Sequence, residues 1–274
     1  MTSQLALTWN PRAWLPWACI VGALVALGGC AARLGDQTAG TDILTESDEG
    51  EVRKRARIRM ELAVGYFEQG QTKIALDELK QVIASDPGFP EAYNLRGLIY
   101  MRLNDLRQSE DSFRRAVALN PRDANTQHNF GWLLCQQGRY EESVRSFQQA
   151  LANPLYAGRA KTLMAEGLCQ ARAGRNAEAE RSLARSYELD AGNPITGFNL
   201  ANLLFQRGDF TRSQFYIRRL NNSELANAET LWLGIKVERS LNDGVAMTQL
   251  AQQLKKRYPQ SREIVAYERG AFDE

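Results

Sequence analysis

The sequence predicts an all-α protein, a right-handed superhelical solenoid of six helical hairpins that follows a cleaved leader and a flexible tether. Three observations predict it. Small and bulky residues recur every 34 positions between about residues 56 and 260. A charge-free run near the N-terminus ends at a cysteine, and the segment between that cysteine and the repeats is polar. Stacked copies of one hairpin bury a continuous core that a single copy cannot bury alone.

Residues 1–29 have the features of a signal peptide. The charge-free run from Ala13 to Ala32 has 20 residues, about enough to span a bilayer core of roughly 30 Å as a helix. Its strongly apolar part, Ala18–Leu27, has only 10 residues, which is the size of a signal-peptide core. The alternative is an uncleaved membrane anchor with an incidental cysteine.

The residues Leu27, Gly28, Gly29 and Cys30 look like a bacterial lipobox. That resemblance implies that the thiol of Cys30 is lipidated, that the chain is cut before it, and that Cys30 becomes the first mature residue. Several acyl chains, each contributing about 0.8 kcal/mol per buried CH₂, hold a protein stably on a membrane. In such lipoproteins Ala31 implies sorting to the outer membrane, with the chain facing the periplasm.

Residues 30–55 are expected to form a flexible tether behind the lipidated cysteine. The segment is poor in aromatic residues and rich in Gly, Thr, Asp and Glu. Such a composition buries too little apolar surface to offset the entropy of ordering the chain. A tether of about 20 residues has a root-mean-square reach of about 25 Å, which lets the folded part stand off the membrane.

The repeats begin near residue 56 and place the same kind of residue at the same position of each unit. Position 8 is small, positions 11 and 24 are bulky, position 20 is small, and a proline follows near position 32. This is the tetratricopeptide pattern, in which two antiparallel helices approach closely where small side chains meet. The small residues at position 8 are Ala63, Gly97, Gly131, Gly167, Ala201 and Gly234.

Six units follow from this register, and position 15 of the first five carries Gly or Asn, as a left-handed helix end requires. An insertion around Pro154–Gly158 shifts the phase by two residues. Residues 261–274 are expected to cap the last repeat. The units are residues 56–89, 90–123, 124–157, 160–193, 194–226 and 227–260.

The net charge of +2 gives no reason to expect nucleic acid or an acidic substrate as a partner. Two cysteines, Cys135 and Cys169, remain in the repeats. They could pair in an oxidising compartment, but they occupy unlike positions of separate units. Free thiols that are buried or line the groove are therefore favoured over a disulfide.

The first helix of each such unit lines the concave surface, and its exposed positions are largely apolar here. An apolar groove in the first three units suits an apolar strand or an amphipathic helix of a protein partner. About half of these side chains are expected to pack against neighbouring helices as core. The predicted groove residues are Met60, Val64, Phe67, Leu98, Met101, His128, Trp132 and Cys135.

No catalytic constellation is recognisable, and neither a cofactor, a metal site nor a small-molecule substrate is expected. His128 is the only histidine, and Cys135 on the same predicted helix leaves a metal ion without third and fourth ligands. No glycine-rich phosphate loop follows a predicted strand. The sequence therefore indicates a binding protein rather than an enzyme.

A lipobox, a short tether and six tetratricopeptide units resemble the type IV pilus biogenesis and stability lipoproteins of the PilF/PilW family. The resemblance covers essentially the mature chain, through phrases such as HNFGWLLCQQGRYEESVRSFQQAL. It implies a pilotin, which binds a secretin subunit and carries it to the outer membrane for assembly. The alternatives are a scaffold for barrel assembly or cell-wall synthesis, or a regulator of such an enzyme.

Overall fold

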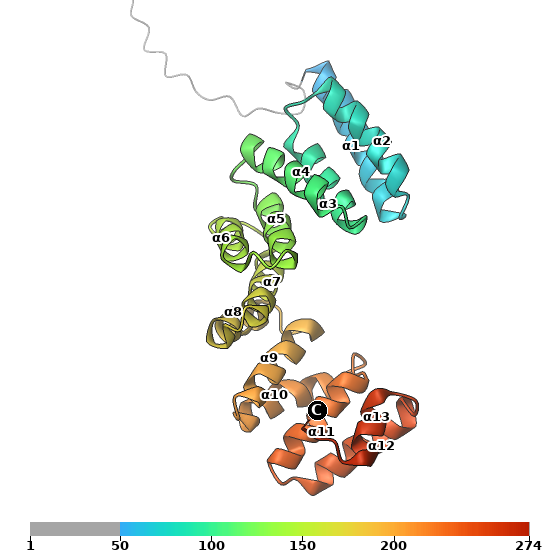
Figure 1. The fold of residues 1–274 in the computed structure, drawn as a ribbon, viewed down its shortest axis with the longest axis vertical. Helices are drawn as coiled ribbons and strands as arrows, with labels where there is room; N and C mark the ends of the chain where they lie inside the picture. The colour runs from blue at the N-terminus through green and yellow to red at the C-terminus, as the bar shows by residue number, and fades with distance from the viewer. Residues whose placement is uncertain (1–49, 274) are drawn as a thin grey trace, which may run out of the picture. The chain divides into compact units, whose positions relative to one another are not determined.

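The computed structural model describes residues 50–273, which form a series of helical hairpins joined in chain order (Figure 1). The predicted signal peptide, Cys30 and residues 30–49 of the predicted tether lie outside these residues. A thirteenth helix, α13, follows the last hairpin. The paired helices are α1 (Glu51–Glu68) with α2 (Thr72–Ser85), α3 (Pro90–Arg102) with α4 (Leu106–Leu119), α5 (Ala124–Gln136) with α6 (Tyr140–Leu151), α7 (Arg159–Arg172) with α8 (Asn176–Leu189), α9 (Pro194–Gln206) with α10 (Phe210–Asn221), and α11 (Ala228–Ser240) with α12 (Gly244–Arg257).

Each hairpin closes where a small residue of its first helix meets a large residue of its second. A Cβ added at Gly97 would lie 2.7 Å from the ring of Phe113, and one at Gly131 would lie 2.8 Å from the ring of Phe147. The rings therefore pack directly on the backbone of the facing helix, which explains the small residue at position 8. The predicted all-α solenoid of tetratricopeptide hairpins is confirmed.

The small residue at position 20 has a second use, because it is often a serine that bonds back to the first helix. Ser109 Oγ donates to the carbonyl of Gly97 at 2.8 Å, and Ser143 Oγ donates to that of Gly131 at 2.7 Å. Ser213 Oγ repeats the bond to Ala201 at 2.8 Å. These hydroxyls are buried, and the bond satisfies them without separating the helices.

The turns inside the hairpins share one backbone conformation. Each contains a residue with positive φ shortly after its first helix, where glycine or asparagine is least strained. Asn104, at φ 59°, takes the place that glycine holds in the neighbouring turns. The six residues are Gly70, Asn104, Gly138, Gly174, Gly208 and Asn242.

The first helix begins earlier than the sequence predicted. The tether was expected to extend to residue 55, but α1 begins at Glu51. Arg53 forms an ion pair with Asp86 and lies 4.7 Å from the centre of the Phe89 ring. Ala56 is fully buried in the core of the first hairpin. These contacts with the segment between α2 and α3 stabilise a turn of helix that its polar composition does not predict.

The prediction that Cys135 and Cys169 are free thiols is wrong, because the two form a disulfide. Their Cα atoms are 5.8 Å apart, within the usual range for such a bond. Cys135 lies on α5 and Cys169 on α7, and these two first helices contact each other directly. Counting positions within each repeat misplaced them, because the two cysteines are 34 residues apart and lie at facing points of neighbouring first helices although their repeat positions differ. The bond covalently joins the third hairpin to the fourth.

The C-terminal helix α13 (Arg262–Arg269) packs against α11 and α12. Ile264 is buried in the core of the last hairpin. Beyond α13, the ring of Phe272 stacks on Trp232 of α11 with centroids 5.3 Å apart. This segment covers apolar surface that a seventh hairpin would otherwise cover.

Candidate functional site

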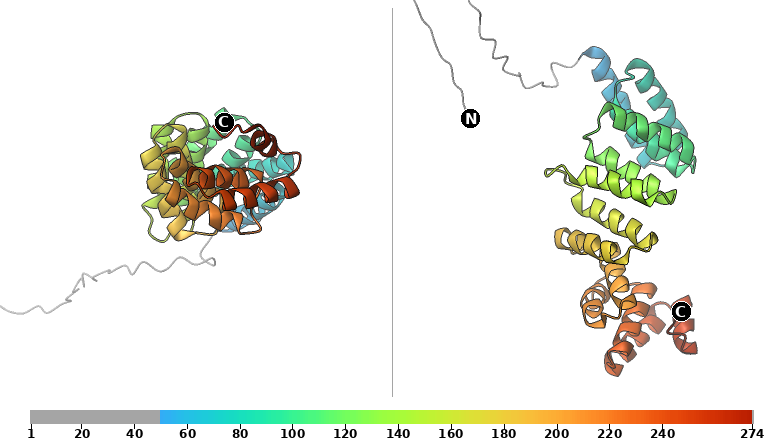
Figure 2. Two further views of the ribbon diagram at one scale, coloured as in Figure 1. Left: turned by 90° about the horizontal axis from the view of Figure 1, so that it is seen from below. Right: turned by 60° about the vertical axis from the view of Figure 1, so that its left-hand side comes forward.

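The first helices of the hairpins form one continuous surface. Each contacts the first helix of the next hairpin, from α1 with α3 through to α9 with α11. The backbones of the second helices in the described chain approach one another less closely, although side chains such as Arg212 of α10 and Glu180 of α8 join them. The first helices are therefore the more closely spaced row, on the inner side of the stack. Figure 2 shows the hairpins stacked in chain order, from blue to red.

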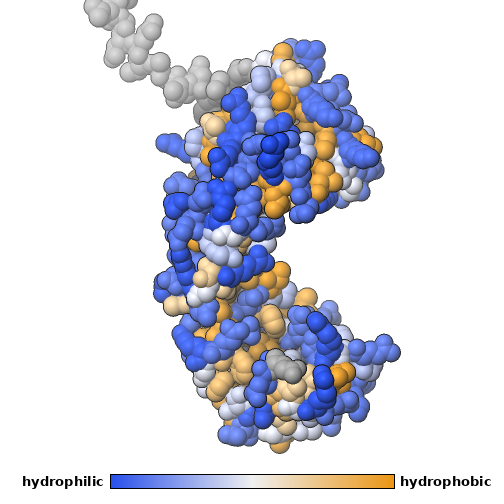
Figure 3. Space-filling model, in the orientation of Figure 1, coloured by the Kyte–Doolittle hydropathy of each residue, from blue (hydrophilic) through white to orange (hydrophobic). Residues whose placement is uncertain are grey.

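Six of the eight predicted groove residues are half-buried on this inner row. Met60, Val64 and Phe67 of α1 also pack against the core of the first hairpin, so they share their surface between core and groove. Figure 3 shows apolar side chains, in orange, over the first two hairpins. The six half-buried residues are Met60, Val64, Phe67, Leu98, Met101 and Trp132.

His128 and Cys135 were also predicted to line the groove, and the structure places both inside the protein. Their exposed fractions are 6% and 2%. Cys135 is held in the disulfide. His128 Nδ1 lies 2.8 Å from Thr162 Oγ1 of α7, and its ring lies 5.9 Å from that of Phe147. Both residues join the third hairpin to the fourth and offer no surface to a partner.

The position of His128 makes this junction sensitive to acid. Burial of the ring, with a smaller contribution from Lys161, lowers the pKa of His128 from 6.5 to about 4. Above pH 6.5 the ring is neutral in both the folded and the unfolded chain. As the pH falls from 6.5 to about 4, the unfolded chain takes up the proton first, so folding stability is lost in this window.

We expect this loss to reach about 3 kcal/mol by pH 4, at about 1.4 kcal/mol per pH unit. The measurement is urea unfolding of the wild type and of His128→Gln at several pH values between 7 and 4. The Gln variant removes the titrating group and retains an amide for Thr162, so its stability should fall less steeply. Parallel curves for the two proteins would show that His128 does not control the acid response.

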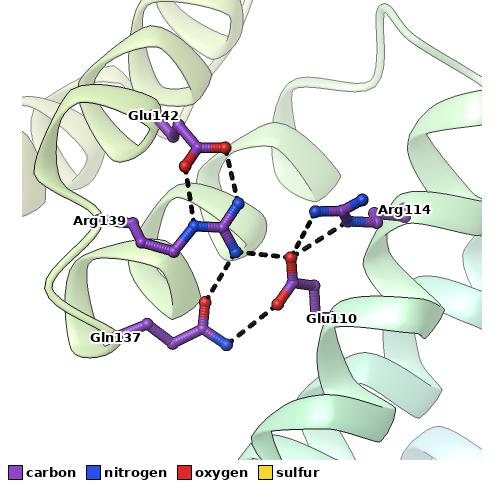
Figure 4. A network of polar contacts seen from close by, with 5 residues as sticks. All are labelled: Glu110, Arg114, Gln137, Arg139 and Glu142. Carbon is purple, nitrogen blue, oxygen red and sulfur yellow. Dashed lines mark hydrogen bonds and ion pairs between the residues drawn. The ribbon is translucent and has the colours of Figure 1, made fainter.

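Polar networks join successive hairpins. In Figure 4, Glu110 of α4 accepts bonds from Arg139 Nη1 at 2.6 Å, from Gln137 Nε2 at 3.2 Å and from Arg114 Nη2 at 2.6 Å. Burial alone would raise the pKa of Glu110, but hydrogen bonds from Arg139, Gln137 and Arg114 outweigh burial and lower it. Glu142 holds the same guanidinium of Arg139 through two bonds. The network fixes the third hairpin against the second.

Comparable carboxylates join later hairpins. Glu180 of α8 accepts bonds from Arg207 at 2.5 Å and from Arg212 at 3.0 Å. Glu238 of α11 is fully buried and accepts bonds from Nε and Nη2 of Arg218 of α10, at 2.7 and 2.9 Å. These ion pairs fix the register in which the first helices present their surface.

Arginines that stack on aromatic rings form a second feature of the inner row, which the sequence reasoning missed. The guanidinium of Arg102 lies 3.8 Å from the centre of the Phe67 ring, and Arg102 Nη1 also donates to the Phe67 carbonyl at 2.8 Å. The guanidinium of Arg172 lies 5.2 Å from the Trp132 ring. In both pairs the cation comes from the next hairpin. Their sequence signal is an arginine at position 13 of the second and fourth units.

Within residues 50–273, no three His, Cys, Asp or Glu side chains are arranged to hold a metal ion. None of the helices in the same range is both long and apolar enough to cross a membrane. The surface that the described residues offer is a row of half-buried apolar side chains with stacked cations beside it. Its chemistry suits the binding of a polypeptide.

Family models of the tetratricopeptide repeat match residues 65–104, 89–155 and 128–194. The chain is also similar to the type IV pilus assembly protein PilF of Pseudomonas aeruginosa, with 26% identity over 245 residues that cover 89% of this chain and 94% of PilF. The match to PilF extends beyond the residues that the repeat models cover.

Two solved structures share the fold over most of the chain. The structure of PilW, a widely conserved type IV pilus biogenesis factor, matches with a TM-score of 0.70 and 28% identity, over 80% of this chain and 99% of PilW. The structure of Pseudomonas aeruginosa PilF matches with a TM-score of 0.74 and 24% identity, over 81% of this chain and 100% of that structure.

Proposed function

Because the chain is a tetratricopeptide-repeat homologue of the type IV pilus proteins PilF and PilW, we propose that it is an adaptor of type IV pilus biogenesis. In this role it binds a secretin subunit and promotes its assembly in the outer membrane. The observation that carries the proposal is the similarity to PilF over nearly the full length of both chains. The inner row of first helices supports binding as its activity rather than catalysis.

The proposed attachment to the outer membrane rests on Cys30, which lies outside the described residues. Lipidation of Cys30 anchors the chain in the outer membrane, and the tether lets the hairpins reach a partner in the periplasm. The Cys135–Cys169 disulfide supports this location, because such bonds persist in oxidising compartments such as the periplasm. Free thiols would have given no such support.

The proposed binding surface for the partner is the apolar surface of α1, α3 and α5. Leu98 and Met101 are half-buried, so a partner side chain covers the remainder of their apolar surface. Burying an aliphatic side chain of this size fully contributes about 1.5–3 kcal/mol. A few such contacts are enough for a specific complex, while the lipid determines where the complex goes.

The test is a pulldown of the tagged full chain from detergent-solubilised membranes of a piliated cell. We expect secretin subunits in the eluate. In cells with the Cys30→Ser variant, we expect the variant to fold normally but the secretin to be absent from the outer-membrane fraction. Recovery of barrel-assembly or wall-synthesis proteins without secretin would contradict the proposal. Normal secretin ring assembly in the Cys30→Ser strain would contradict the escort role.

The same assay locates the binding surface. Leu98→Glu should lower secretin recovery at least tenfold, because it places a charge in the apolar surface of α3. Leu189→Glu is the matched control, since Leu189 is 57% exposed at the end of the second helix α8. Circular dichroism should show equal helix content in both variants. Equal recovery of secretin with both variants would show that the binding surface does not include this part of α3.

A further inference from the structure

Two kinds of residue on the inner row, arginines and aromatic residues, alternate from one hairpin to the next. Position 13 of the first helix is arginine in the second, fourth and sixth units and an uncharged or acidic residue in the others. At positions 9 and 12 of the first helices, aromatic residues occur in the other three units, as Phe67, Trp132 and Phe205. The residues at position 13 are Glu68, Arg102, Gln136, Arg172, Gln206 and Arg239.

In each pair of hairpins a cation from the second lies over an aromatic ring of the first. Arg102 lies over Phe67 and Arg172 over Trp132, and in the last pair Lys236 Nζ lies 5.5 Å from the Phe205 ring. Arg239 stacks instead on Phe272, with its guanidinium 4.1 Å from the ring centre. Stacking of this kind holds a guanidinium in place while its edge remains free to bond.

The three arginines at position 13 lack a carboxylate partner in the described chain. No Asp or Glu oxygen lies within 4.0 Å of Arg102, Arg172 or Arg239, and all three side chains are exposed. Several other arginines of the described hairpins are ion-paired, among them Arg139, Arg175 and those that bond Glu180 and Glu238.

Few acidic groups lie near these arginines on the first helices. From α3 to α11, these helices carry four carboxylates in total. Glu91 and Glu229 lie in the first turn of their helices, at the end opposite to position 13. Glu166 and Glu238 are buried, with 5% and 0% exposed. Beyond the first turn, the helices that carry the three arginines therefore hold no exposed carboxylate, although Glu68 follows Phe67 on α1 and Asp273 follows Phe272.

The geometry points to an acidic, extended polypeptide segment as the occupant of this edge, with its carboxylates bound by Arg102, Arg172 and Arg239. The inference deepens the proposed adaptor function, since it specifies the chemistry of the bound segment. Arginine binds carboxylates through two parallel bonds, and a stacked guanidinium loses little freedom in forming them. Half-buried apolar side chains on the same row of first helices, including Met101, Leu168 and Phe198, favour a peptide over a lipid head group.

The spacing sets the expected pattern of acids in the segment. Packed helices lie roughly 10 Å apart, so two hairpins advance roughly 20 Å along the row. An extended chain covers that distance in about six residues, at about 3.3 Å per residue. A segment that binds all three arginines therefore has carboxylates about six residues apart, with apolar residues between them.

The test uses the full chain purified in detergent and a fluorescein-labelled 14-residue peptide with Glu at positions 1, 7 and 13 and Leu, Thr and Ala between them. A second peptide has Gln at the same three positions. Fluorescence anisotropy should show at least tenfold tighter binding of the Glu peptide at 50 mM NaCl, and a smaller difference at 300 mM NaCl. The triple variant R102Q/R172Q/R239Q should bind both peptides equally.

The matched control is R107Q/R145Q/R185Q, which removes the same charge from exposed arginines of the second helices α4, α6 and α8. It should retain the preference for the Glu peptide. Replacing the three inner arginines by Lys keeps the charge and should retain part of the preference. If the triple Gln variant unfolds, R172Q alone is used and should weaken the preference.

Equal binding of the Glu and Gln peptides by the wild type would overturn the inference, as would an equal loss in the outer control. Binding of phosphatidylglycerol vesicles that depends on the inner arginines, without binding of the Glu peptide, would also overturn it in favour of a lipid surface. The assay contains no secretin, so its outcome is independent of the membrane pulldown. If the peptide assay contradicts the acidic segment, the pulldown still tests the proposed binding of secretin, and the reverse also holds.

Discussion

Replacing Phe147 by alanine is expected to lower the free energy of unfolding by about 3–5 kcal/mol. Phe147 is fully buried and packs directly on the backbone of α5 at Gly131. Its ring also contacts the cluster around the disulfide, which includes Ala165 of the fourth hairpin. Removal of the ring therefore leaves a cavity at the junction of two hairpins, where a rigid backbone on one side and a disulfide on the other prevent collapse.

Urea unfolding followed by circular dichroism measures this loss, and hydrogen exchange shows whether α5–α8 open first. Phe215→Ala is the matched control, since it removes the same atoms from a side chain that is 62% exposed on α10. It should change stability by no more than about 0.5 kcal/mol. Similar losses in the two variants would show that this packing does not limit stability.

Replacing Arg218 by alanine is expected to cost about 3–5 kcal/mol, the range for a buried charge that loses its partner. Glu238 is fully buried on α11, and Arg218 of α10 donates two bonds to it. Gln214 Nε2 donates a third at 2.7 Å. Without the guanidinium, the carboxylate keeps only the amide, so the last hairpin should detach from the fifth before the rest unfolds.

Hydrogen exchange in α11 and α12 reports this detachment directly. The double variant R218A/E238Q should recover most of the lost stability, because it removes the unpaired charge as well. Arg175→Ala breaks the exposed pair with Glu141 and should cost less than about 1 kcal/mol. If the double variant is no more stable than Arg218→Ala, the buried charge is not the cause of the loss.

The hairpins themselves could be predicted because the constraint on them is local and repeated. A small residue must face a large one at fixed separation, as Gly131 faces Phe147, and a left-handed residue must follow each first helix, as Gly138 does. The start of α1 was misjudged because its first turn is held by contacts with Asp86 and Phe89, about 35 residues away. Composition within a short window carries no information about such contacts.

The inner surface was predicted less well, because a repeat position does not specify which neighbour covers it. His128 and Cys135 occupy groove positions in their own unit, but Thr162 and Cys169 of α7 lie against them. The stacked arginines were missed for a related reason. Arg102 and Phe67 belong to different units, and only a comparison of alternate units shows the period that they share.

The disulfide also determines how the chain carries mechanical load. A pull between the two ends of residues 50–273 follows the shortest covalent route, which crosses from α5 to α7 through the sulfur atoms. The segment between the cysteines, which are 34 positions apart, then bears no tension, and roughly 110 Å of contour length cannot be drawn out. Under such a load the hairpins outside this closed loop are therefore expected to extend first, because the disulfide keeps the segment between α5 and α7 from being drawn out.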